Sequence, residues 1–171
     1  MEGEQRDSSQ DDPEESGGMP DTERAVHALS LAGEMLQSAE SKSSESSYEE
    51  AIVLARDSMR LASSAVLFLD GKVASDLDTS CRYLSGKYGD VLNVDEWREV
   101  ERMPGMELAQ RLTSIFGGRD RLRKDAEKAL ESAARFLGAT TAIVDQSTQA
   151  EEGNESEARP APKERLFGEA S

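Results

Sequence analysis

The sequence has one cysteine, Cys81, and one histidine, His27, among its 171 residues. A single thiol cannot form a disulfide within the chain, so we expect a reducing environment and predict a cytoplasmic protein. A single imidazole is too few for most histidine-based metal sites and for catalytic triads that need further partners of this kind. The composition therefore predicts no metal ion and no other cofactor, and it offers no catalytic residue.

Long apolar runs are also absent. Ala65–Leu69 is among the longest, with five residues, whereas a helix that spans a membrane needs about 20 such residues. Acidic and polar residues occupy the N-terminus, where a secretion signal would carry an apolar stretch. We therefore expect a soluble protein with no membrane contact, and 171 residues suit one ordinary domain.

The formal net charge of −15 is concentrated at the two ends of the chain. Residues 1–21 carry eight acids and one base, residues 146–171 carry six acids and three bases, and the stretch between them has a net charge of only −5. Both ends contain few apolar residues, so ordering them would cost conformational entropy without compensating burial. We predict a disordered acidic N-terminal tail over 1–21, a helical bundle over 22–145 and a disordered C-terminal tail over 146–171.

Between the tails, apolar residues recur at the spacing of α-helices. The first helix is expected to begin after Asp21, and Ser41–Ser47 is expected to be a loop or a frayed end. Ser47 and Glu50 have the spacing of a capping box, so the second helix should start there and stop at Asp70–Gly71. Its apolar arc is wide enough to face more than one neighbour, which predicts that this helix is the centre of the bundle.

Shorter and longer helical segments follow. The pattern predicts a third helix capped by Ser75 or Asp76 and ending near Gly89, a short turn capped by Asp95, a short helix from Met106 to Phe116, and a last helix from about Arg119 to Asp145. No strand pattern is visible, and alanine on the helix faces favours a slim, closely packed core. We predict an all-α fold, an up-and-down antiparallel helical bundle of four to five helices with disordered acidic tails.

Neither of the two scarce residues occupies a setting that suggests chemistry. His27 follows Glu23 by four residues, whereas di-iron bundles use a Glu-x-x-His spacing on each of two helices and therefore a second histidine. We expect His27 to be a surface side chain. Cys81 lies on the apolar face of the third helix, so we expect a buried, unreactive thiol.

The one local excess of positive charge comprises Arg119, Arg121, Arg123 and Lys124, at the start of the last helix. A solvated first turn with ion pairs to neighbouring aspartates would account for it. Bases at a helix N-terminus oppose the helix dipole, however, which indicates that an anion such as a phosphate could bind there. These four residues are the candidate phosphate- or partner-binding site, although the acidic chain as a whole would repel a long polyanion.

Three segments resemble parts of the HEPN superfamily, which consists of small helical bundles. The run Tyr48–Gly71 looks like the second helix of these domains, and Leu29-x-x-Ala32-x-x-Met35-Leu36 is similar to their first. Ala126-x-x-x-Leu130-x-x-Ala133-x-x-Phe136-Leu137 is similar to their last helix. The resemblance covers roughly residues 22–145 and rests on patterns of small residues on helices.

Many members of that family are metal-independent RNases, toxins that are paired with nucleotidyltransferase-type antitoxins. The resemblance implies a homodimer whose site contains an arginine, a polar residue and then a histidine four to six residues further on. Counted from Arg119, Arg121 or Arg123, the positions from Lys124 to Leu130 contain no histidine. Without an imidazole that titrates near neutral pH, the chain has no general base for the ribose 2′-hydroxyl of an RNA substrate. This argues against an enzyme.

Three functions remain open at this point. The leading one is a non-catalytic HEPN-like interaction module, homodimeric, that binds a protein partner such as a nucleotidyltransferase-type protein, or a nucleotide. The first alternative is a toxin-like, metal-independent RNase with an atypical site built from Arg119 and Arg123. The second is an unrelated acidic adaptor or scaffold that binds its partner through its tails.

Overall fold

The computed structural model describes residues 21–105 and 118–157. Within these ranges every regular element is a helix, which confirms the predicted all-α fold. The helices are α1 (Thr22–Ser44), α2 (Tyr48–Leu69), α3 (Leu77–Tyr88), α4 (Val94–Glu101) and α6 (Gly118–Glu157). Residues 1–20 and 158–171 of the predicted tails, and the short helix predicted from Met106 to Phe116, lie outside the described residues.

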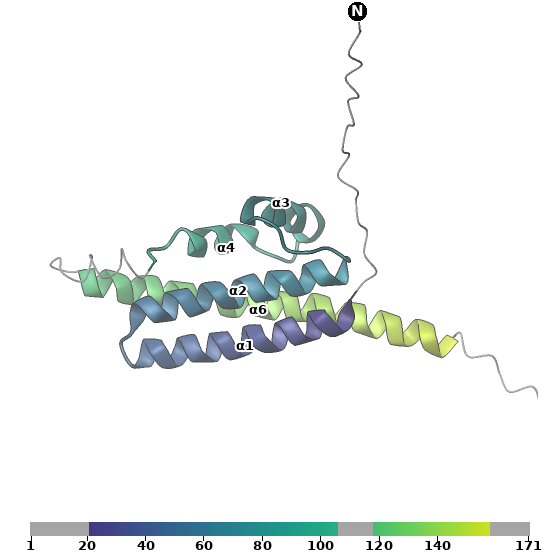
Figure 1. Cartoon of the computed structure of the whole chain (residues 1–171), viewed down its shortest axis with the longest axis horizontal. Coiled ribbons are helices and arrows are strands. Elements are labelled where there is room, and N and C mark those ends of the chain that lie inside the picture. The colour runs from purple at the N-terminus through teal and green to yellow at the C-terminus, as the bar shows by residue number, and fades with distance from the viewer. Residues whose placement is uncertain (1–20, 106–117, 158–171) are drawn as a thin grey trace, which may run out of the picture.

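The long helices α1, α2 and α6 pack against one another, and the shorter α3 and α4 lie beside α2 on the side away from α1 (Figure 1). Thr22, at the start of α1, donates from Oγ1 to Glu151 Oε2 at 2.8 Å, so α1 runs antiparallel to α6. In α4, Glu96 pairs with Arg135 and the later Glu99 pairs with Lys128, so α4 also runs antiparallel to α6. The bundle is therefore up-and-down, and α4 is the limb that runs back along α2.

The polar stretch at the end of α1 is helical. The sequence predicts a loop or a frayed end over Ser41–Ser47, but α1 continues to Ser44. Within it, serine hydroxyls donate to carbonyls one turn earlier, Ser41 to Gln37 at 3.2 Å and Ser44 to Glu40 at 3.0 Å. Ser47 is the N-cap of α2, as predicted, but its side chain makes no capping hydrogen bond. The predicted capping box is therefore wrong.

Two further boundaries differ from the prediction. The short helix α4 starts at Val94 and is capped by Asn93, whose Oδ1 accepts from the Glu96 amide, whereas the sequence predicts a cap at Asp95. The last helix does not end at Asp145 but continues to Glu157, into the stretch predicted to be a disordered tail. Contacts with the start of α1 and hydroxyl-to-carbonyl bonds one turn apart support this extension.

No described helix, α6 included, combines the length and the apolar character that a membrane span requires.

The core is made largely of small side chains where the long helices meet. The buried alanines are Ala25, Ala28, Ala32 and Ala39 in α1, Ala51, Ala55, Ala62 and Ala65 in α2, and Ala126, Ala129 and Ala133 in α6. Between α1 and α2, the buried Ser58 donates from Oγ to the Ala32 carbonyl at 2.7 Å, which requires a close approach of the two helices. Helix α2 contacts each of the other four described helices, as expected of the central helix.

The end of α2 is the point at which α3 is attached. Gly71 has a φ of 62°, a conformation that favours glycine, and the predicted stop at Asp70–Gly71 is confirmed. The Asp70 carboxylate accepts from Tyr83 Oη at 2.9 Å and from Tyr88 Oη at 3.1 Å, and it pairs with Lys87. Burial and the adjacent carboxylate raise the pKa of both tyrosines. One carboxylate thus holds three side chains of α3 against the end of α2.

Candidate functional site

The four basic residues predicted as a binding site are all exposed at the start of α6. Arg119 and Arg123 are one turn apart, whereas Arg121 lies about 200° around the helix from Arg119, because successive residues are about 100° apart. Arg123 Nη2 lies 3.9 Å from Asp120 Oδ1, an ion pair between side chains that are at least half exposed. Exposed pairs of this kind contribute little to stability. The basic side chains therefore do not converge on one point, because Arg119 and Arg123 share one face of α6 whereas Arg121 and Lys124 share another.

His27 is exposed on α1, as predicted, and lies far from this basic group. The start of α1 is beside the later part of α6, and the basic group is at the other end of α6 (Figure 1). Because Thr22 contacts Glu151 and the helices are antiparallel, His27 lies beside a point some five residues before Glu151. At about 1.5 Å per residue, this point is about 40 Å along α6 from Arg119.

Cys81 is fully buried in α3, and this burial raises the pKa of its thiol. The predicted unreactive thiol is in agreement with both observations. Over residues 21–105 and 118–157, no three side chains of histidine, cysteine, aspartate or glutamate are grouped so that they could hold a metal ion.

A charged cluster that was not predicted lies where α2 meets α4. The Glu101 carboxylate, 8% exposed, accepts from Arg60 Nε at 2.6 Å and Arg60 Nη2 at 2.7 Å, and from Trp97 Nε1 at 3.3 Å. Arg56, one turn earlier on α2, places its Nε 3.7 Å from the same carboxylate and donates from Nη2 to the Met103 carbonyl at 2.9 Å. Two guanidinium groups therefore surround one carboxylate, which leaves this group of three with one net positive charge.

A cavity of about 260 Å³ lies beside the charged cluster, between α2, the start of α3 and α4. Its lining residues are Arg60, Ser63, Ser64, Ala74, Ser75, Leu77, Ser80 and Trp97. Its polar side-chain groups are four hydroxyls, one guanidinium and the indole N–H of Trp97, and none of the lining residues is acidic. We call it the serine cavity. Its residues come from separate elements of the chain, so no local sequence pattern reveals it.

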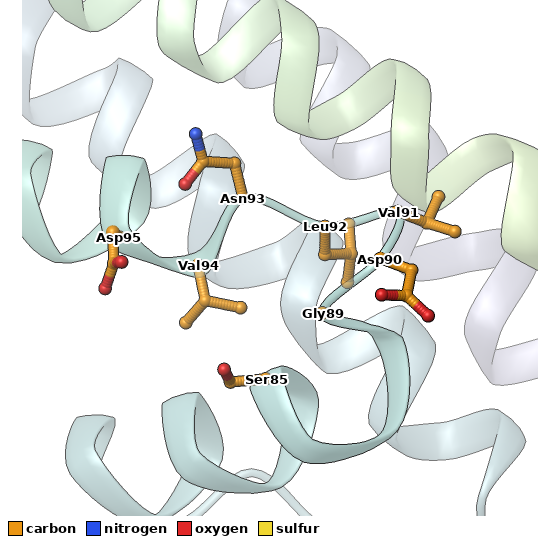
Figure 2. Close-up of a pocket in the computed structure, with 8 residues that line it drawn as sticks. All are labelled: Ser85, Gly89, Asp90, Val91, Leu92, Asn93, Val94 and Asp95. Atoms are coloured by element: carbon orange, nitrogen blue, oxygen red, sulfur yellow. The ribbon is translucent and has the colours of Figure 1, made fainter.

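A second hollow, of about 340 Å³, lies between the end of α3 and the start of α4 (Figure 2). Ser85 and Val94 point toward one another across it, and the connector that contains Gly89 closes one side. Gly89 is required there, because a Cβ atom would collide with the carbonyl oxygen of Ser85. The hollow is lined by the carboxylates of Asp90 and Asp95 but by no basic, histidine or cysteine side chain, so it has neither a nucleophile with a base nor an anion-binding group.

The edge where α1 meets α2 forms an uncovered face on the side opposite α6 (Figure 1). The Arg24 guanidinium lies 4.1 Å from the centre of the Phe68 ring at one end of this edge, and Lys42 Nζ lies 3.1 Å from Glu50 Oε2 at the other. Between these ends, at spacings of four and seven residues, are partly exposed apolar side chains: Leu31 and Met35 on α1, and Leu54 and Leu61 on α2. We call the surface formed by these four residues and Phe68 the α1–α2 face. No other described helix packs over it.

Comparisons with family models, with curated proteins and with solved structures give no match to this chain. The resemblance to HEPN domains therefore stays a prediction, and the surfaces of the chain have to be interpreted from its own residues.

Proposed function

We propose that this chain is a non-catalytic, HEPN-like helical interaction module that acts as a homodimer and binds a protein partner or a nucleotide. The α1–α2 face is the observation that carries the proposal. Leu54, Leu61 and Phe68 recur at seven-residue spacing on α2, the repeat with which helices pair along a shared seam. A contiguous apolar surface on a small acidic bundle is typical of a protein–protein contact.

A second copy of the chain is the occupant that this face fits best. Two neighbouring helices of this length form a surface of about 33 Å by 20 Å, close to the roughly 800 Å² that each partner contributes to a stable interface. A two-fold axis through the middle of the face would exchange its ends. It would bring the Arg24–Asp21 pair of one copy beside the Lys42–Glu50 pair of the other, so both rims of the contact would be charged.

The non-catalytic part of the proposal is supported by the positions of Arg119, Arg123 and His27. The two arginines share a face of α6, but the imidazole is about 40 Å away along the bundle, too far to act on the same bond. Metal-free incubation with single-stranded RNA tests the alternative of an atypical RNase. The RNA is expected to remain intact. Cleavage that is lost in an Arg123→Ala variant would establish the RNase instead.

Sedimentation equilibrium of the intact protein tests the dimer. The wild-type chain should have twice the monomer mass of 18.6 kDa, and Met35→Glu, which places a charge in the α1–α2 face, should shift it to the monomer. Val26→Glu is the matched control, because Val26 is 51% exposed on another side of the same helix. A wild-type monomer, or equal effects of the two substitutions, would contradict the proposal. The adaptor alternative predicts a mass that neither substitution changes.

The protein partner in this proposal is of the nucleotidyltransferase type, as the family resemblance implies, and the complex is cytoplasmic. The buried, reduced Cys81 is compatible with that compartment. Co-purification of the chain with such a protein, and its loss when the dimer is broken by Met35→Glu, would link the partner to the α1–α2 face. Co-purification that Met35→Glu leaves unchanged would assign the partner to another surface.

A further inference from the structure

The serine cavity has polar groups that are not used by the fold. Ser80 is only 5% exposed, it lines the cavity, and its hydroxyl makes no hydrogen bond with another described residue. Ser75 is a second hydroxyl of the lining without a described partner. Neither hydroxyl is committed to a partner among the described residues, so both are available to a group that enters the cavity.

The other two hydroxyls can adapt to such a group. Ser63 and Ser64 both donate to the carbonyl oxygen of Arg60, at 2.8 and 2.9 Å. Because two side chains donate to one acceptor, either hydroxyl can rotate toward a ligand while the other keeps the carbonyl satisfied. Three of the four hydroxyls can therefore donate to an acceptor in the cavity at the same time, while the fourth stays on the Arg60 carbonyl.

The lining of the cavity favours an anion, because it contains one guanidinium and no carboxylate. Arg60 holds Glu101 with Nε and Nη2, and its Nη1 lies 3.6 Å from the surface carboxylate of Asp57. Arg56 is the second guanidinium beside the cavity, so the two arginines balance the two carboxylates that contact them, Glu101 and Asp57. Leu77 and Ser80 belong to the first turn of α3, whose dipole presents its positive end to the cavity, although the N-cap Asp76 offsets part of it.

We propose that the serine cavity binds the phosphate group of a small molecule. Serine hydroxyls and the Nη1 of Arg60 would donate to the phosphate oxygens, and the apolar side chains of Leu77 and Trp97 would contact the rest of the molecule. The ligand displaces Asp57 from Arg60, an exposed pair that is weak. This site is separate from the α1–α2 face and from the basic group at the start of α6, so it goes beyond the interaction function.

The single tryptophan of the chain makes the proposal directly measurable. Trp97 lines the cavity, so its indole N–H resonance reports on this site and on the Glu101 carboxylate to which it donates. Inorganic phosphate is titrated into the full chain at constant ionic strength, with sodium chloride as the reference and phenyl phosphate as a second probe. The Trp97 resonance should shift with phosphate in a saturable way, and phenyl phosphate should bind more tightly because its ring contacts the apolar part of the lining.

Two serines on α3 provide the matched variants. Ser80→Ala removes a hydroxyl of the cavity and should weaken phosphate binding about fivefold, the value expected for one hydrogen bond. Ser85→Ala removes an exposed hydroxyl of the same helix outside the cavity and should leave the affinity unchanged. Arg60→Lys, which keeps the charge but not the geometry that holds Glu101, should also weaken binding.

Several results would overturn the proposal. One is a Trp97 resonance that responds equally to phosphate and chloride, and another is equal phosphate affinity in Ser80→Ala and wild type. A third is a response that Arg123→Ala abolishes, because that result would place the anion on α6. The Met35→Glu variant should retain the Trp97 response. Failure of the dimer and failure of the phosphate site are therefore distinguishable in the same set of samples.

Discussion

Arg60 of α2 and Glu101 of α4 are joined by two parallel hydrogen bonds, from Nε at 2.6 Å and from Nη2 at 2.7 Å, although they are 41 residues apart in the chain. This pair attaches the short helix α4 to the central helix α2. Trp97 and Arg56 contact the same carboxylate, so one acidic side chain joins three side chains of α2 and α4.

Replacing Glu101 should therefore loosen α4. Glu101→Gln keeps the shape but removes the charge beside two guanidinium groups, and we expect a loss of about 3 kcal/mol in the free energy of unfolding. Glu99→Gln is the control in the same helix, because the Glu99–Lys128 pair is half exposed and should be worth less than about 1 kcal/mol. Urea unfolding followed by circular dichroism measures both. Equal losses in the two variants would show that Glu101 is an ordinary surface acid.

Ser58 tests how closely α1 and α2 are packed. Ser58→Ala removes the hydrogen bond to the Ala32 carbonyl and should cost about 1 kcal/mol. Ser58→Val keeps no hydrogen bond and adds volume at a fully buried contact, so it should cost a further 1–3 kcal/mol, roughly, through overpacking. Thermal unfolding of the two variants would show whether valine is the worse residue. A valine variant as stable as the alanine variant would contradict a closely packed helix pair.

Two glycines of the α3 region should respond to alanine in opposite ways. A Cβ atom at Gly86 meets nothing, and glycine within a helix is less favourable than alanine, so Gly86→Ala should stabilise the protein by up to about 1 kcal/mol. A Cβ atom at Gly89 collides with the Ser85 carbonyl oxygen, so Gly89→Ala should destabilise it. Melting temperatures that move in the same direction for both would be inconsistent with the geometry at the end of α3.

The cluster at Asp70 predicts a loss of stability in alkali. Burial and Asp70 raise the pKa of Tyr83 and Tyr88, and Asp70 outweighs burial to raise the pKa of Lys87. The folded chain therefore holds these protons more tightly than the unfolded chain. The stabilisation is complete below the ordinary pKa values near 10 and is lost as the pH rises through the higher folded values.

Urea unfolding at several values between pH 8 and pH 11 measures this effect. The free energy of unfolding of the wild type should fall across the upper part of that range. The fall should be smaller in a Tyr83→Phe, Tyr88→Phe double variant than in the control Tyr48→Phe, whose ring is not in the cluster. An equally steep fall in the double variant and the control would contradict the role of Asp70.

The helices themselves could be predicted because their signals are local. Asp21 caps α1 through the Arg24 amide, and Gly71 stops α2, at the positions that the sequence indicates. The wide apolar arc of α2 also faces more than one neighbouring helix, as predicted. Its Ile52 and Met59 are fully buried, whereas Leu61 of the same arc is at the partly exposed α1–α2 face. Periodicity shows that α2 has several neighbours but not which side remains uncovered.

Features that depend on distant contacts could not be predicted. The extension of α6 to Glu157 is supported by Thr22 of α1, which a local pattern does not reveal. Asn93 rather than Asp95 caps α4, because two residues with capping side chains are close together and packing of Val94 decides between them. The serine cavity combines residues of α2, α3 and α4, so it exists only in the folded chain.

Cross-linking through α1 tests the central claim, a homodimer that meets at the α1–α2 face. The native Cys81 is buried, so an introduced cysteine is the accessible thiol of the described part of the chain. A short flexible bismaleimide should convert the Met35→Cys protein to a covalent dimer under dilute conditions, and it should leave Val26→Cys monomeric. Equal yields from the two variants, or no dimer from either, would contradict the account.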